Sequence, residues 1–134
     1  MVKDSLLRHP KLRHTFVYSN KTLQDVIFRA ALAQLQAQHP DRLRVIHTIT
    51  REAGTASPNE DIRSGRVTLD LLREVLDREP NSIIYTCGPA VSVWERRAHA
   101  ALGTTPTPRF LETMQAYLTE LRFPRERIKV EAFG

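Results

Sequence analysis

The sequence predicts an α/β domain with three layers, α/β/α, around a mainly parallel sheet. Apolar runs of strand length alternate with amphipathic runs of helix length along the chain. That alternation is typical of parallel strands joined by right-handed crossovers. The length of 134 residues fits one domain, since domains usually run to about 100–150 residues. We therefore expect residues 1–134 to form a single Rossmann-like domain.

The first half of the chain predicts two strands with a helix between them. Thr15–Tyr18 is the first strand and Val45–Ile49 the second. Thr22 caps the intervening helix, which ends at Pro40. Four apolar residues spaced by four share one face of that helix: Leu23, Ile27, Ala31 and Leu35. Residues 51–64 are polar and contain glycine and proline, so we expect a long loop there.

The second half predicts two more strands and two more helices. Ser82–Cys87 is a buried strand, followed by a turn at Gly88 and by Pro89, which suits the first position of a helix. Ile128–Phe133 is the terminal strand. Apolar residues mark the buried faces of two helices: Leu69, Leu72 and Leu76 in one, and Leu111, Met114, Leu118 and Leu121 in the other.

Composition argues against several classes of protein. The net charge of +5 and an aromatic content of 7% do not make a nucleic-acid-binding surface, because basic and aromatic residues are not interleaved. No run of apolar residues is long enough for a membrane span, and the N-terminus lacks the apolar core of a secretory signal. The five histidines are not at metal-ligand spacing, so we expect no metal. One cysteine permits no intrachain disulfide and fits a cytoplasmic location.

Candidate functional residues follow the strands, because parallel sheets bind ligands beyond their carboxyl ends. Lys21 and Arg51 each come just after a strand, where two cations suit a phosphate. The alternative is that both are solvated loop charges, which is the usual explanation for an individual cation in a chain with 20 basic residues. Gly88 follows the lone Cys87 and allows close approach of a ligand. The tripeptide Cys87-Gly88-Pro89 is also explained as a buried cysteine, a turn glycine and a first-turn proline.

Five short motifs occur in order, each at or near a predicted strand end. They are Phe16–Thr22, Thr48–Arg51, Gly65–Val67, Thr86–Pro89 and Glu131–Gly134. Together they resemble the NAD(P)-binding half of the ferredoxin–NADP reductase-like flavoproteins. The Cys-Gly-Pro sequence is the most specific single match. The resemblance covers most of the chain outside a stretch near residues 94–110.

The resemblance implies a module that presents nicotinamide to a flavin. It implies NADP or NAD as cofactor, FAD or FMN on a flavin-binding domain or subunit, and a redox acceptor protein as a further partner. The catalytic centre would contain Cys87, Glu131 and Phe133. The cofactor would contact Gly88 and Pro89 at its pyrophosphate or nicotinamide portion. Its adenosine ribose and 2′-phosphate would lie near Ser19, Asn20, Lys21, Thr50 and Arg51. The basic pair favours NADPH over NADH, although the adjacent Glu52 weakens that preference.

The sequence departs from the family pattern in two places. Residues 94–110 resemble an insertion that would serve as a partner surface or a lid. The central strand and glycine-rich pyrophosphate turn, expected before Val2, are absent, and residues 2–9 resemble the end of the helix that follows that turn. The missing strand would leave Thr15–Tyr18 and Ile83–Cys87 without a neighbour. We expect that these strands pair directly, that another chain supplies the strand, or that the chain is part of a longer protein.

Three functions remain open at this point. The leading one is the NAD(P)H-binding portion of a flavin-dependent reductase, incomplete and inactive on its own. The alternative is a non-catalytic interaction subunit that retains the fold, which the absent pyrophosphate turn supports. A basic nucleic-acid-binding module rests on the net charge alone.

Overall fold

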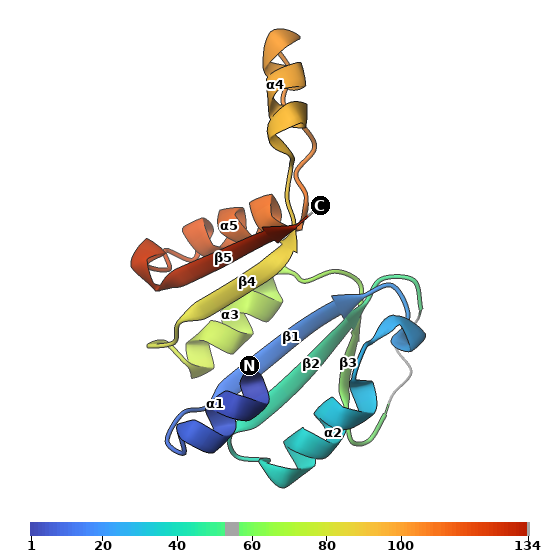
Figure 1. Ribbon diagram of the computed structural model, residues 1–134, viewed down its shortest axis with the longest axis vertical. Coiled ribbons are helices and arrows are strands. Elements are labelled where there is room, and N and C mark those ends of the chain that lie inside the picture. The colour runs from blue at the N-terminus through green and yellow to red at the C-terminus, as the bar shows by residue number, and fades with distance from the viewer. Residues whose placement is uncertain (53–56, 134) are drawn as a thin grey trace. The chain divides into compact units, whose positions relative to one another are not determined.

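The computed structural model describes residues 1–52 and 57–133 (Figure 1). It divides into two compact units, residues 1–68 and 69–134. We describe each unit by itself. The expected loop at 51–64 lies partly outside the described residues, and so does the C-terminal Gly134 of the last motif.

The first unit is built on three parallel strands in the order β1-β2-β3. Strand β1 (His14–Asn20) pairs with β2 (Leu43–Ile49) along its whole length, and β2 pairs with β3 (Asp61–Ser64). The central β2 is buried at every position except the half-buried Arg44. A strand covered on both faces reads as a nearly continuous apolar run, which explains why the sequence predicts β2 clearly.

Two helices cover one face of this sheet. Leu6 of α1 (Val2–Arg8) is 2% exposed and packs with Leu43 and Val45 of β2. Helix α2 (Arg29–Gln38) adds Leu32 and Leu35 to the same cluster. Val2 and Phe16 also pack against it. A short helix does form at Val2–Arg8, within the stretch 2–9 that resembles the end of a helix.

The expected helix after Thr22 is interrupted. Thr22 does cap, exchanging hydrogen bonds with Asp25, but the capped element is a single 3₁₀ turn, Leu23–Asp25. Val26 is then extended, and Phe28 is left-handed with φ 60° before α2 begins. The three residues Val26–Phe28 are β-branched or aromatic, types that lose side-chain freedom in a helix. The predicted apolar face is broken accordingly, since Ile27 is 61% exposed.

Strand β3 lies where the sequence predicts a loop, so that prediction is wrong for Asp61–Ser64. Only Ile62 is apolar in this edge strand, which gives no recognisable alternation. Its charged residues pair locally: Asp61 accepts hydrogen bonds from Arg63 at 2.9 Å and from Arg44 of β2 at 3.2 Å. Side-chain pairing across the ladder therefore supports a strand that hydrophobic pattern alone does not indicate.

The second unit contains a parallel pair, β4 (Ile84–Pro89) and β5 (Ile128–Phe133). Helix α3 (Leu69–Arg78) precedes the pair, and α5 (Phe110–Glu120) packs on β4. A short 3₁₀ turn, Arg125–Arg127, leads into β5. Helix α5 buries three of its four predicted residues: Leu111, Met114 and Leu118. In α3 the fully buried residue is Leu71, beside the predicted face.

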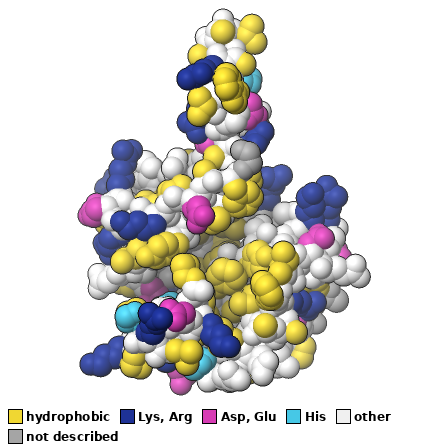
Figure 2. Space-filling model, viewed as in Figure 1, with side chains coloured by type: hydrophobic (Ala, Val, Ile, Leu, Met, Phe, Trp, Pro, Cys, Tyr) yellow, Lys and Arg dark blue, Asp and Glu magenta, His cyan; other side chains and the backbone are white. Residues whose placement is uncertain are grey.

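Helix α4 (Val93–Ala101) projects away from β4, β5 and α5 (Figure 1). It buries none of its residues. Trp94 and Leu102 are each 76% exposed, and Figure 2 shows hydrophobic and basic side chains together on this projecting segment. Residues 90–109 therefore form an excursion between β4 and α5, which contains the expected insertion at 94–110 apart from Phe110, the first residue of α5. Their origin as an insertion stays a prediction.

Each sheet has at one edge a strand that was expected to lose a neighbour because of the missing strand. β1 is an edge strand of the first sheet and β4 of the second. Among the described residues, no strand borders the second side of either one. Because β1 and β4 belong to different sheets, the structure does not show the direct pairing that was the first of the three expected outcomes.

Candidate functional site

In the first unit, the loops that follow β1 and β2 are joined by backbone hydrogen bonds. The amide of Thr50 donates to the carbonyl of Asn20 at 3.1 Å, and the amide of Arg51 donates to that of Lys21 at 2.9 Å. These bonds continue the β1–β2 ladder beyond its last paired residues. Four of the predicted adenosine-site residues are therefore brought together at the carboxyl end of the sheet. Ser19, the fifth, is exposed one residue earlier in β1.

Three polar side chains at this edge have no partner in the described part of the chain. The side-chain amide nitrogen of Asn20 is buried there without a hydrogen-bond partner. The exposed side chains of Lys21 and Arg51 form no ion pair among the described residues. A buried donor without a partner costs free energy, and two adjacent cations attract an anion. The donor and the cations fit a ligand that carries both hydroxyl groups and negative charge.

Glu52 stands beside this cluster but is engaged locally. One of its carboxylate oxygens accepts a hydrogen bond from the backbone amide of Leu23 at 3.0 Å. This contact ties the loop after β2 to the 3₁₀ turn after β1. Glu52, which weakens the preference for NADPH predicted from the sequence, therefore already accepts a hydrogen bond from the turn.

In the second unit, four of the predicted site residues lie on one exposed face of β4 and β5. Cys87 pairs in register with Glu131, and Pro89 pairs with Phe133. Paired residues in a parallel ladder point to the same side, so these four residues share a face. Cys87 is exposed and Phe133 is 58% exposed. The structure thus brings Cys87, Glu131 and Phe133 to one surface at the strands' carboxyl ends.

Gly88 faces the opposite side of the pair, toward α5. A Cβ atom at this position would overlap the ring of Phe110. The close approach that Gly88 permits is therefore that of a side chain of the same unit, which gives this glycine a packing role. Whether a cofactor also approaches its backbone stays a prediction.

Pro89 does not begin a helix, which corrects the sequence-based expectation. It is the last residue of β4, and α4 begins only at Val93, with Ser92 as its N-cap. The amide and hydroxyl of Ser92 donate to Glu95, and the hydroxyl accepts from the amide of Glu95. A helix start facing the ligand directly after Cys87-Gly88-Pro89 is therefore absent from the described structure, because residues 90–92 intervene.

A cluster of charged side chains at the base of α4 was missed by the sequence analysis. Glu112, in the first turn of α5, accepts hydrogen bonds from the amide of Val91 and from Arg96, each at 3.0 Å. Arg109 pairs with Glu95 at 2.7 Å. The sequence held one signal, the capping box Ser92-x-x-Glu95; Glu112 has the same place in α5, where its carboxylate accepts from the backbone amide of Arg109.

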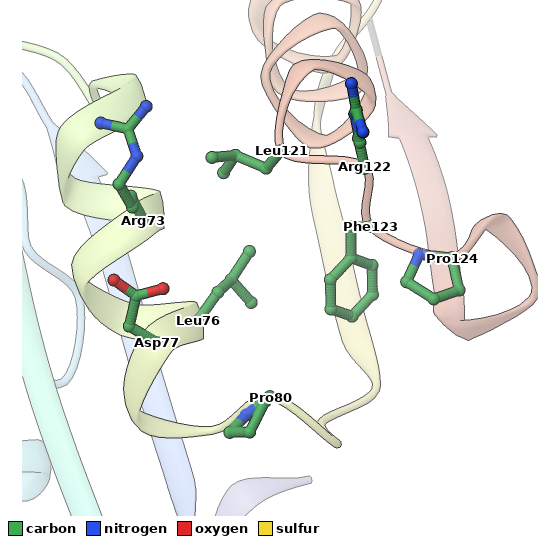
Figure 3. A pocket seen from close by; sticks show the side chains of 8 residues that line it. All are labelled: Arg73, Leu76, Asp77, Pro80, Leu121, Arg122, Phe123 and Pro124. Atoms are coloured by element: carbon green, nitrogen blue, oxygen red, sulfur yellow. The ribbon is translucent and has the colours of Figure 1, made fainter.

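A cavity in the second unit lies away from these residues (Figure 3). It has a volume of about 240 Å³ and is lined from α3 and from the connection between α5 and β5: Arg73, Leu76, Asp77, Pro80, Leu121, Arg122, Phe123 and Pro124. Pro80 precedes β4 and Pro124 precedes β5, so the cavity lies at the amino ends of these strands. None of the predicted site residues lines it.

Comparison with known proteins identifies the family. The sequence model of the oxidoreductase NAD-binding domain matches residues 1–93. The chain belongs to this family. Membership confirms the fold class and the resemblance to ferredoxin–NADP reductase-like flavoproteins. It also establishes NAD binding as the characteristic of the domain.

Individual relatives of this NAD-binding domain are redox proteins. NADH-cytochrome b5 reductase 2-A of Vanderwaltozyma polyspora is 35% identical over 80 residues, which are 59% of this chain and 26% of that protein. Nitrate reductase [NADH] of Volvox carteri is 33% identical over 92 residues, 66% of this chain and 10% of that protein. Flavohemoprotein A of Dictyostelium discoideum is 25% identical over 138 residues, 100% of this chain and 26% of that protein. The NAD-binding domain thus matches about a quarter or less of each relative.

The described part of the NAD-binding domain contains neither a membrane-spanning helix nor a metal-binding cluster. Within residues 1–52 and 57–133, no helix has the length and apolar character needed to cross a bilayer. The same residues contain no group of three or more histidine, cysteine or acidic side chains arranged to hold a metal ion.

Proposed function

We propose that this chain is the NAD(P)H-binding portion of a flavin-dependent reductase. In this proposal, hydride passes from the nicotinamide to FAD or FMN held by a flavin-binding domain or subunit, and electrons continue to a redox acceptor. The relatives support it, since they include reductases named for NADH. The observation that carries it is the joined strand ends of β1 and β2, where the Asn20 amide and the two cations have no side-chain partner among residues 1–52 and 57–133.

The first unit would bind the adenosine portion of the cofactor. Asn20 would donate its free amide N–H to a ribose hydroxyl or phosphate oxygen. Lys21 would contribute a point charge, and Arg51 a planar guanidinium suited to two phosphate oxygens. The hydroxyl of Thr50, which lies 3.5 Å from the carbonyl of Asn20, adds a further polar group at the same edge.

The second unit would hold the nicotinamide portion against the flavin. The cofactors supply hydride transfer when bound, and the protein orients them. Cys87 offers a small polarizable side chain at the face shared with Glu131. Phe133 offers an exposed ring at the end of β5 for stacking, and Glu131 an exposed carboxylate. These three residues would shape the approach of the two rings and exclude water around them.

Nucleotide titration of this chain tests the binding step. NADPH and NADH fluorescence should change on binding, and Lys21→Ala should weaken binding by about tenfold, as loss of one phosphate-directed charge predicts. Lys11→Ala is the matched control, because this exposed lysine precedes β1 and so lies at the other end of the strand. Equal affinities for the two variants would contradict the assignment of the site.

The catalytic step is tested on the protein made from the complete reading frame that contains this chain. We expect it to bind flavin and to oxidise NADPH or NADH. A colourless protein with no oxidation of either nucleotide would exclude a reductase. If that protein also shows no nucleotide binding that depends on Lys21 and Arg51, the non-catalytic interaction subunit becomes the better interpretation.

A further inference from the structure

The charged cluster at the base of α4 holds the backbone that leaves the Cys87-Gly88-Pro89 strand end. The amide of Val91 donates to Oε1 of Glu112 at 3.0 Å, and its carbonyl accepts from Nε of Arg96 at 3.2 Å. The carbonyl of Ala90 accepts from Nη1 of Arg109 at 3.4 Å. Three charged side chains therefore fix the two residues that follow Pro89.

Glu112 connects these contacts to one another. Its Oε1 also accepts from Nη2 of Arg96 at 3.0 Å, and its Oε2 accepts from the backbone amide of Arg109 at 3.0 Å. Arg109 in turn donates from Nη2 to Oε1 of Glu95 at 2.7 Å. Glu112 thus accepts a backbone amide from each side of the excursion, from the outgoing chain at Val91 and from the returning chain at Arg109.

The environment keeps Glu112 ionised. Partial burial opposes the charge, but the amides of Val91 and Arg109 and the nearby Arg96 outweigh it, and the pKa of Glu112 is lowered. Its side chain is 22% exposed, and Val91 is only 5% exposed. Hydrogen bonds to an ionised group shielded in this way are among the stronger ones in proteins.

The same carboxylate caps the turn of α5 that carries Phe110. Phe110 follows Arg109 directly, and its ring fills the space above Gly88. The strand end is therefore held from two directions, through the backbone after Pro89 and through the ring over Gly88. Helix α4 contributes no buried residue of its own, so the cluster fixes the strand end and does not anchor a core helix.

We propose that Glu112 is a positioning residue for the nicotinamide half of the cofactor, acting through Val91 and the first turn of α5 on the Cys87-Gly88-Pro89 strand end. The inference rests on the proposed function. Small misplacements of a reacting group cost large factors in rate. Loss of the Glu112 charge should therefore slow hydride transfer and leave recognition of the adenosine half unchanged, because the residues assigned to that half belong to the first unit.

The test compares Glu112→Gln with Glu120→Gln in the protein from the complete reading frame. Glu120 is exposed at the opposite end of α5 and is the matched control. Two quantities are measured: the rate of flavin reduction by NADH or NADPH, and the affinity for 2′-AMP and AMP, which carry only the adenosine half. We expect Glu112→Gln to lower the reduction rate about tenfold with unchanged affinity for both adenosine nucleotides, as removal of a charge-assisted contact predicts.

Equal reduction rates in the two variants would overturn the inference. So would a parallel loss of rate and adenosine affinity in Glu112→Gln, which indicates a general structural defect. If Glu112→Gln fails to fold, Arg96→Gln decides, because Arg96 holds the carbonyl of Val91 and its side chain is 59% exposed. Failure of the proposed function is distinguishable, since the unsubstituted protein would then reduce no flavin at all.

Discussion

The ring of Phe110 occupies the space that a side chain at position 88 would need. Gly88 lies in β4 and Phe110 begins α5, and any Cβ added to the glycine would overlap the ring. The Cys-Gly-Pro sequence therefore contains a glycine that lets a helix approach a strand. The residue after Gly88 ends the strand, and the residue before it is exposed on the opposite face.

Gly88→Ala should destabilise the chain by about 1–3 kcal/mol, the usual cost of overpacking. The measurement is the free energy of unfolding from chemical denaturation. In a Phe110→Ala background the sign should change, because alanine in a strand is favoured over glycine by about 0.5–1 kcal/mol once the clash is gone. An equal penalty in both backgrounds would show that the ring is not the cause.

The sequence predicts the buried elements well because burial leaves a pattern. β2 is covered on both faces and reads as an apolar run, while α5 buries residues at helical spacing. β3 escapes prediction because it is short and charged, with Asp61 satisfied by side chains of Arg44 and Arg63. The break at Phe28 escapes because spacing alone does not report a left-handed residue.

The core of the first unit gives a sharp pair of substitutions in one helix. Leu6 is 2% exposed and packs with Leu43 and Val45, whereas its neighbour Leu7 is 68% exposed. Leu6→Ala should lower the free energy of unfolding by about 2–5 kcal/mol. Leu7→Ala should change it by no more than about 0.5 kcal/mol. Urea denaturation of both variants checks this prediction. Similar losses of unfolding free energy in the two variants would contradict the orientation of α1.

Acid should destabilise the chain before its carboxylates titrate. His47 of β2 is 2% exposed, its Nδ1 has no hydrogen-bond partner, and burial lowers its pKa below the ordinary 6.5. The pKa of His14 is lowered as well, by burial and then by the charges of Arg42 and His9. The unfolded chain therefore binds more protons just below pH 6.5, and stability falls as the pH drops through that window.

Denaturant melts between about pH 8 and about pH 5 check the histidine prediction, since histidine titrates in that range. His47→Gln and His14→Gln should each reduce the loss of stability on acidification, and the double variant should reduce it most. The carboxylates add their own loss only at lower pH, because hydrogen bonds from Arg29 and Arg63 lower the pKa values of Glu60 and Asp61. An unchanged pH dependence in the double variant would assign the acid sensitivity elsewhere.

The sequence predicts the residues that would contact the cofactor, but it does not predict the residues that hold them in place. The sequence places Lys21 and Arg51 after two strands, and the ladder then joins them through their backbones. Glu112 lies 25 residues after Cys87 in the sequence. No local pattern connects the two, because the contact depends on the path that residues 90–109 take out and back.

The exposed cation at position 51 makes the choice between the two nucleotides testable. A guanidinium matches a phosphate in charge and shape, so its contribution should be larger for NADPH, which carries the 2′-phosphate, than for NADH. Arg51→Ala should weaken NADPH binding by about tenfold and NADH binding by much less, as expected for one charge-assisted contact. Fluorescence titrations of the chain with each nucleotide measure both affinities. Equal losses for NADPH and NADH would direct Arg51 to a phosphate that the two cofactors share, and the preference for NADPH would then have no support at this residue.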